Sequence, residues 1–219
     1  MIDRDNILIV LPFVCLLFLG IVMVASSSVF VAEKMFGNPF YFANRQIIFM
    51  CIGIFALVLA VSIPSNLFYN YDWFFLVTSL LLLIALFIPS VGTEVNGSLR
   101  WIRIGSFGLQ PSEVSKLALL IYMSGYCVRR LSEINTTVGF FRPLCVLAVF
   151  GLLIMNQRDL GSTLVIGMFV VAILFFAGIS FLQFFLLMSL MGVMALMTVL
   201  LTPFRYARLI SFTDPFEDF

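Results

Sequence analysis

Long apolar runs separated by short polar segments dominate the chain. They lie at about 7–30, 47–63, 73–88, 112–128, 143–155, 163–179 and 181–201. Apolar residues occur all round each run instead of alternating with polar ones, which favours helices over the strands of a membrane barrel. A helix needs about 20 residues to cross the hydrocarbon core of a bilayer. The pattern therefore predicts seven transmembrane helices.

The fifth run is shorter than a full span. Arg142 and Pro143 stand at its start, and four polar residues, 156–159, follow its end. We expect a short or re-entrant span here, because without it both neighbouring helices would end on the wrong sides of the membrane. No linker, charge block or repeat divides the chain, so we expect residues 1–219 to form a single membrane domain.

Composition supports the same class. Hydrophobic residues make up 63% of the chain and charged residues 11%, with a mean hydropathy of +1.17. A soluble domain is about half apolar and about a quarter charged, so we expect an all-α polytopic membrane protein. With a net charge of +1 and no histidine, the sequence supports neither nucleic-acid binding nor a histidine-ligated metal site. The four cysteines are scattered through apolar runs and indicate packing residues.

The distribution of cations presents a conflict. Lysine and arginine in short loops normally mark the cytoplasmic side. A cytoplasmic N-terminus would instead leave most of them outside, namely Lys34, Arg45, Arg100, Arg103, Arg158, Arg205 and Arg208. Either the N-terminus faces outward, or these cations have a function outside the cytoplasm.

The segment 95–116 holds the first candidate site. Asn-Gly and further glycines predict turns, and Trp101 beside Arg100 is typical of a headgroup boundary, so we expect a loop on the membrane surface. The next helix should begin near Pro111, with Glu113 and Lys116 on one face. Two interpretations remain open for these two charges. They neutralise each other, or Lys116 joins Arg100 and Arg103 in binding a phosphate group.

Two further segments carry polar residues. In 157–163, Asp159 suits the N-cap of the sixth helix, or else lines a polar site beside the Lys116 helix. In the tail, Arg205 and Arg208 lie three residues apart, and three carboxylates follow at 214, 217 and 218. On composition alone the tail is a solvated loop of mixed charge.

Taken together and in order, these motifs resemble the SEDS family, the bacterial shape, elongation, division and sporulation proteins. The motifs are Gly97-Ser98-x-Arg100-Trp101-Ile102, Gln110-Pro111-Ser112-Glu113-x-x-Lys116, Gln157-x-Asp159-Leu160-Gly161-Ser162, Arg205-x-x-Arg208 and Asp214-Pro215-x-Glu217-Asp218. Ala25-Ser26-Ser27-Ser28, Pro39-Phe40-Tyr41-Phe42 and Arg45 are more similar to the cell-division branch than to the elongation branch.

The resemblance implies a topology. Members have ten membrane helices and a large extracytoplasmic loop after the seventh, so we expect this chain to be an N-terminal portion that stops in that loop. The cation-rich loops would lie outside the cytoplasm and the N-terminus inside, in the bacterial inner membrane and at the division septum. Arg158 departs from the pattern, because the family commonly has proline there.

The resemblance also implies an activity, the polymerisation of lipid II by a peptidoglycan glycosyltransferase. The C4 hydroxyl of one sugar would attack the anomeric carbon of another chain, with inversion and an undecaprenyl diphosphate leaving group. Asp218 would be the catalytic base. The implied substrate-binding residues are Arg45, Arg100, Trp101, Gln110, Glu113, Lys116, Asp159, Arg205 and Arg208, of which Glu113 and Asp159 would hold the cations in position.

No organic cofactor and no metal site are implied, although a divalent cation near Asp218 is compatible with the chemistry. The implied partners are lipid II, a class B penicillin-binding transpeptidase and other membrane proteins of the division machinery. Two other functions stay open: a flippase for lipid II, and a non-catalytic scaffold that recruits the transpeptidase. We expect the 219-residue chain alone to be inactive, since a terminal Asp218 would not be held within proton-transfer distance.

Overall fold

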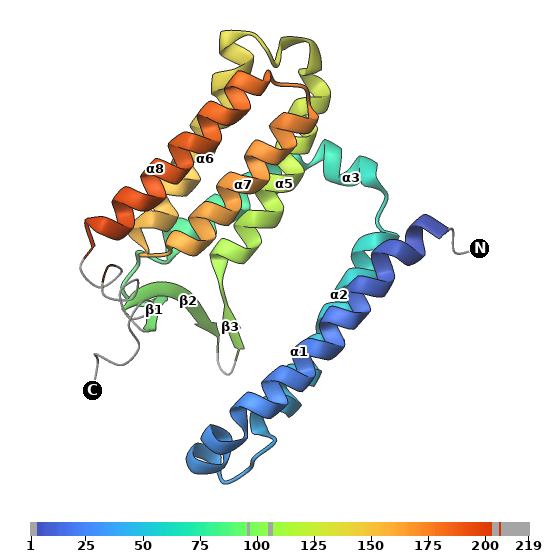
Figure 1. The fold of residues 1–219 in the computed structure, drawn as a ribbon, viewed down its shortest axis with the longest axis vertical. Helices are drawn as coiled ribbons and strands as arrows, with labels where there is room; N and C mark the ends of the chain where they lie inside the picture. Colours follow the sequence, from blue (N-terminus) through green and yellow to red (C-terminus); the bar gives the residue numbers. More distant parts are fainter. Residues whose placement is uncertain (1–3, 96, 105–106, 203–205, 207–219) are drawn as a thin grey trace. The chain divides into compact units, whose positions relative to one another are not determined.

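The computed structural model describes residues 4–95, 97–104, 107–202 and 206 (Figure 1). The chain divides into two compact units, residues 1–64 and 65–219. Helices make up most of both units, which confirms the expected all-α polytopic class. In the described part, four helices are long and apolar enough to cross a membrane: residues Val10–Phe36 of α1, and all of α2, α6 and α8.

The first unit is a helical hairpin. Helix α1 (Arg4–Phe36) and helix α2 (Tyr41–Ser62) are joined by a short turn in which Gly37 has a φ of +64°. The rings of Phe36 and Tyr41 stack across this turn with centroids 4.0 Å apart. Small residues let the two helices approach, since Ala32 and Ala43 are buried, whereas most large apolar side chains of both helices are exposed.

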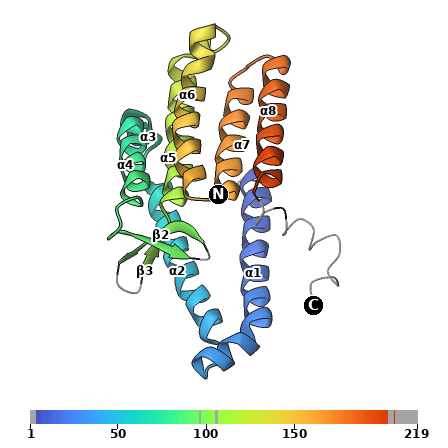
Figure 2. The ribbon, with the colours of Figure 1, turned by 90° about the vertical axis from the view of Figure 1, so that its left-hand side faces the viewer.

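The second unit is a helical bundle. It contains α3 (Ser65–Asn70), α4 (Asp72–Ala85), α5 (Pro111–Arg129), the 3₁₀ turn η1 (Leu131–Glu133), α6 (Thr137–Asn156), α7 (Leu160–Phe176) and α8 (Phe181–Leu200). Helix α7 packs against α5, α6 and α8 (Figures 1 and 2). Its residues Ile166, Val170 and Leu174 join Leu83 of α4 and Phe150 of α6 in the buried core.

Helix boundaries follow local chemistry. Pro111 occupies the first turn of α5, where a missing N–H costs nothing. The Thr136 side chain caps α6 by accepting from the Gly139 N–H, and Ser180 and Gln183 form a reciprocal capping box at α8. Gly178, with a φ of +95°, permits the tight connection between α7 and α8.

The segment between α4 and α5 is a three-stranded antiparallel sheet, where the sequence predicted a surface loop. Its strands are β1 (Gly92–Val95), β2 (Ser98–Ile104) and β3 (Phe107–Leu109), in the order β1-β2-β3. Between β1 and β2, Thr93 pairs with Trp101 but Glu94 pairs with Leu99, so Arg100 is an extra, bulged residue. Such bulges redirect side chains. The sheet lies at the end of the bundle opposite to the α5–α6 connection (Figure 1).

The seven predicted spans correspond to α1, α2, α4, α5, α6, α7 and α8. The fifth differs from its prediction, because α6 begins at Thr137 and continues through Arg142 and Pro143 for 20 residues. Proline has no N–H, so the carbonyl of Gly139, four residues earlier, loses its helical donor. The Tyr126 hydroxyl of α5 donates to that carbonyl instead, at 2.9 Å. This replacement from a neighbouring helix allows a full span where the sequence indicated a short one.

Candidate functional site

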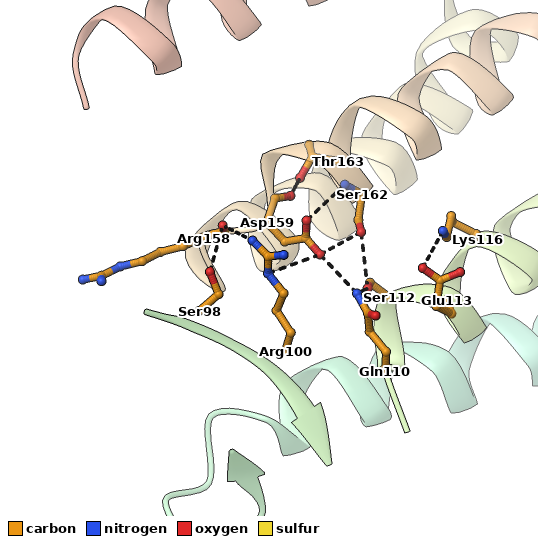
Figure 3. A network of polar contacts seen from close by, with 10 residues as sticks. All are labelled: Ser98, Arg100, Gln110, Ser112, Glu113, Lys116, Arg158, Asp159, Ser162 and Thr163. Atoms are coloured by element: carbon orange, nitrogen blue, oxygen red, sulfur yellow. Dashed lines mark hydrogen bonds and ion pairs between the residues drawn. The ribbon is translucent and has the colours of Figure 1, made fainter. Parts of the chain in front are cut away.

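Asp159 is the centre of a polar network where β2, the start of α5 and the start of α7 meet (Figure 3). As the N-cap of α7 it accepts from the Ser162 N–H through Oδ1 at 3.2 Å. Its Oδ2 accepts from the Ser162 hydroxyl at 2.7 Å. The residue is only 4% exposed. A carboxylate at this end of a helix is stabilised by the dipole and by these donors, so Asp159 is the predicted N-cap, while its role in a functional site stays a prediction.

Arg100 reaches this carboxylate from the bulge of β2. Its Nε lies 3.8 Å from Asp159 Oδ2, and its Nη2 donates to the Arg158 carbonyl at 3.1 Å. The buried Nε has no hydrogen-bond partner within the described part of the chain, while 37% of the whole side chain is exposed. The guanidinium is therefore oriented by the protein on one side and open on the other.

The turn between α6 and α7 presents its backbone to the sheet. Arg158 has a φ of +61°, a left-handed conformation that is unfavourable for any residue with a Cβ. In this conformation its carbonyl accepts from both Ser98 Oγ, at 3.4 Å, and Arg100. Its guanidinium donates to the Gly97 carbonyl at 3.3 Å. Proline cannot adopt a positive φ, so the geometry here differs from that of a proline at this position.

Gln110 and Ser112 extend the network to α5. The Gln110 side-chain amide donates to Ser112 Oγ at 3.0 Å and to Asp159 Oδ2 at 3.5 Å. Ser112 and Ser162, both buried, lie 3.5 Å apart through their hydroxyls. These contacts tie the first turns of α5 and α7 together beneath Arg100.

Gln157 has a structural position. Its side chain is buried, and Nε2 donates to the carbonyl of Leu83 at 3.3 Å. Leu83 lies in the last turn of α4, where carbonyls have no partner within the helix. Gln157 therefore joins the α6–α7 turn to the end of α4 rather than facing the open side of Arg100.

Lys116 and Glu113 pair with each other. The Lys116 Nζ lies 2.6 Å from Glu113 Oε1, one turn into α5. The Lys116 side chain is 19% exposed and the Glu113 side chain 57%. Mutual neutralisation, one of the two interpretations left open by the sequence, describes this contact. Among the described residues, no hydrogen bond or ion pair joins Lys116 or Glu113 to Asp159, and Figure 3 shows the pair as separate from the Asp159 network.

Trp101 and Arg103 take no part in the Asp159 network, and Arg45 belongs to the other compact unit. Trp101 packs against β3, where a Cβ added at Gly108 would lie 3.0 Å from the indole ring. Arg103 is exposed, on the face of β2 opposite to the buried neighbouring Ile102, and its predicted grouping with Arg100 on one phosphate stays a prediction. Arg45 belongs to the first unit, where its guanidinium lies over the rings of Tyr41 and Phe49.

Asp218, Arg205 and Arg208 lie outside the described residues. Their proposed roles as base and binding residues stay predictions. Among the residues that the structure describes, no cluster of three acidic, cysteine or histidine side chains could hold a metal ion.

Sequence reasoning missed several members of the network. Ser98 and Ser162 appeared only as letters within motifs, and the Arg158 carbonyl has no side-chain signal at all. Asp72 was also missed. It is buried at the start of α4 and pairs with Arg129 at the end of α5 at 2.5 Å. An acid opening one span and a cation closing the next, which suit the two helix dipoles, could have identified this pair.

The arrangement is suited to binding an anion at the membrane boundary. An arginine held by a carboxylate and a carbonyl keeps its remaining donors in a defined direction, which favours recognition of a phosphate or diphosphate group. The open side of Arg100 supplies positive charge beside apolar helices, while Lys116 on α5 is paired with Glu113.

Comparisons with known proteins agree on one family. A family model described as a cell cycle protein, covering FtsW, RodA and SpoVE, matches residues 6–219. A probable peptidoglycan glycosyltransferase FtsW from Pseudomonas fluorescens is 39% identical over 204 residues, which are 93% of this chain and 50% of the relative. Another from Aliivibrio salmonicida is 39% identical over 221 residues, 100% of this chain and 54% of the relative. The chain thus spans about half the length of these curated relatives.

Solved structures share the fold. The rod shape determining protein RodA of Thermus thermophilus superposes with a TM-score of 0.64 at 22% identity, over 83% of this chain and 58% of that one. A chain from a structure described as the structural coordination of polymerization and crosslinking by a peptidoglycan synthase complex superposes with a TM-score of 0.62 at 25% identity. That match covers 90% of this chain and 59% of the other.

Proposed function

Since this chain belongs to the FtsW/RodA/SpoVE family of cell cycle proteins, we propose that the full-length protein is a peptidoglycan glycosyltransferase that polymerises lipid II. The names of the relatives support this activity. The identity of about two residues in five to FtsW proteins supports a role in cell division rather than in elongation.

The observation that carries the proposal is that the Arg100 side chain is held on one side and exposed on the other. The side chain is restrained by Asp159 and the Arg158 carbonyl, yet more than a third of its surface is open. Lipid II presents a diphosphate at headgroup level and a polyprenyl chain in the bilayer. A prearranged guanidinium can bind that diphosphate and stabilise the charge that grows on it as it leaves.

The other residues have graded roles in this proposal. Asp159 positions Arg100, and Gln110 helps to hold Asp159. Lys116 adds a second cation for the diphosphate once an anion competes with Glu113 for it. Arg45, Trp101, Arg205 and Arg208 contribute contacts to the headgroup or the glycan.

Asp218 is the proposed base. It removes the proton of the acceptor C4 hydroxyl as that oxygen attacks the anomeric carbon, while the bond to the diphosphate breaks and the configuration inverts. Both sugars and the leaving group come from lipid II, so the step needs no organic cofactor. A divalent cation near Asp218 would assist the departure of the diphosphate.

Location and partners follow from the same proposal. The protein would lie in the bacterial inner membrane at the septum, with its N-terminus in the cytoplasm. The sheet end would then face outward, where lipid II is consumed. The solved complex that coordinates polymerization with crosslinking supports a class B penicillin-binding transpeptidase as partner, beside other division proteins.

Polymerisation of lipid II by the purified full-length protein tests the activity. We expect glycan strands from the unsubstituted protein and none from the Asp218→Asn variant with transpeptidase binding intact. Equal polymerisation by that variant would refute the role of Asp218 as the catalytic base. If neither the unsubstituted protein nor the variant makes glycan, but both transfer lipid II across vesicle membranes, a flippase would be favoured. If the Asp218→Asn variant still binds its partner and still supports cell division, a scaffold would be favoured.

A further inference from the structure

A groove between α5 and α6 lies away from the Asp159 network. Its volume is about 450 Å³. Tyr122 and Tyr126 of α5 line one side, and Phe141, Arg142, Cys145 and Val146 of α6 line the other. The groove is near the connection of α5 to α6, which is the end of the bundle opposite to the sheet (Figure 1).

Arg142 gives the groove its chemistry. It lies five residues after the start of α6, a helix long and apolar enough to cross a membrane. At 1.5 Å per residue, its Cα is about 7.5 Å from the start of that helix, a distance from which the long, exposed arginine side chain can extend toward the headgroup boundary. Cations at such depth need an anionic or polar partner. Within the described residues Arg142 has no acid within ion-pair distance, whereas the nearby Arg130 pairs with Glu133 at 2.7 Å.

Specific contacts between α5 and the start of α6 fix the walls of the groove. The hydroxyl of Tyr126 is held by the Gly139 carbonyl, which fixes this ring against the start of α6. The Tyr122 ring lies beside it, with centroids 6.5 Å apart. Gly139 is required at this junction, because a Cβ there would lie 2.0 Å from the Glu133 carbonyl oxygen. Beyond Arg142, the lining along α6 is apolar.

From these observations we propose that the groove binds an anionic glycerophospholipid of the leaflet opposite to the sheet. The lipid phosphate pairs with Arg142, and an acyl chain lies along Phe141, Cys145 and Val146. The charge of Arg142 selects an anion, and the apolar lining beyond it selects a hydrocarbon tail over free phosphate. The site is separate from lipid II polymerisation and lies at the other membrane surface.

Lipid retention by the full-length protein tests the proposal. The protein is exchanged in detergent between phosphatidylglycerol and phosphatidylcholine, and bound lipid is counted by native mass spectrometry. We expect phosphatidylglycerol to be retained preferentially, and Arg142→Gln to reduce that retention about fivefold, the effect of one cation near a membrane surface. Arg130→Gln, which removes the same charge from a residue already paired with Glu133, is the matched control and should change retention little. Equal losses in both variants would overturn the site.

Cys145 gives a second readout that needs no substitution of Arg142. In a background with Cys15→Ser and Cys51→Ser, phosphatidylglycerol should slow the alkylation of Cys145 by a small maleimide, and phosphatidylcholine or inorganic phosphate should not. Equal protection by inorganic phosphate would assign the site to a free anion and overturn the proposal. A Cys145 that is unreactive in every lipid would show that protein covers the groove, which would also overturn it.

Discussion

The Nε atom of Arg100 lies 3.8 Å from Oδ2 of Asp159, and this pair joins the bulge of β2 to the first turn of α7. Nearly all of the Asp159 surface is buried, while Arg100 keeps an open side. The acid therefore acts on the site by orienting the arginine.

Replacing Arg100 should impair polymerisation far more than replacing the neighbouring arginine of the same strand. Arg100→Gln removes the proposed charge-assisted hydrogen bonds from the guanidinium to the leaving diphosphate, worth about 1.5–3 kcal/mol. We therefore expect the rate of glycan synthesis from lipid II to fall at least about tenfold. Arg103→Gln removes the same charge from an exposed face and should cause a smaller loss. Equal losses would mean that net charge, not the orientation by Asp159, determines the rate.

The left-handed backbone at Arg158 can be tested by glycine and proline. Arg158→Gly relieves a conformation that costs about 1 kcal/mol with a side chain, so thermal unfolding in detergent should shift upward or stay unchanged despite the lost contact to Gly97. Arg158→Pro cannot keep a φ of +61° and should lower the unfolding midpoint and weaken the anchor of Arg100. An unchanged midpoint and rate in the proline variant would contradict the observed turn.

The hydrogen bond from Tyr126 to Gly139 should stabilise α6 around Pro143. Tyr126→Phe leaves the Gly139 carbonyl without a donor and should destabilise the bundle by about 1 kcal/mol. Tyr122→Phe also removes a tyrosine hydroxyl, but one with no hydrogen bond in the described part of the chain, and serves as the control. Reversible unfolding in mixed micelles measures both. A larger effect at Tyr122 would count against this explanation of the full-length span.

The pair of Asp72 and Arg129 should contribute more stability than the pair of Arg130 and Glu133. Asp72→Asn leaves a partly buried cation without its partner, and we expect a cost of about 2 kcal/mol, below that of a fully buried pair because Arg129 still reaches water. Glu133→Gln breaks an exposed pair and should cost about 0.5 kcal/mol. Unfolding of the two variants under identical conditions gives the comparison, and a reversed order would refute the assignment.

The orientation of the bundle can be measured with single cysteines. In a background without the native cysteines, Arg103→Cys should react with a membrane-impermeant maleimide that is added to the extracytoplasmic side of an intact inner membrane. Arg130→Cys should react only after the membrane is opened. Labelling in the opposite order would place the sheet in the cytoplasm and remove the proposed access to lipid II.

Features set by near neighbours could be predicted from the sequence. Hydropathy located the apolar helices, because each predicted run coincides with a helix. Within the described residues, four of these helices are long and apolar enough to cross a membrane. The N-cap of Asp159 and the Glu113–Lys116 pair involve residues three apart, and one turn of helix brings such residues together whatever surrounds it.

Contacts between distant segments required the tertiary structure. The sequence of segment 92–109 predicts turns, yet its three strands pair through backbone hydrogen bonds. The bulge that orients Arg100 has no local sequence signal. Pro143 marked the start of a short predicted span. The full α6 continues through this proline, and Tyr126 on another helix supplies the missing donor. Arg100 and Asp159 meet because the α6–α7 turn docks against β2, which depends on how whole helices pack. The sequence by itself thus determined where the apolar helices lie and which residue caps α7. The packing decided which polar groups share a site, because a buried donor or acceptor takes its partner from whatever element lies beside it.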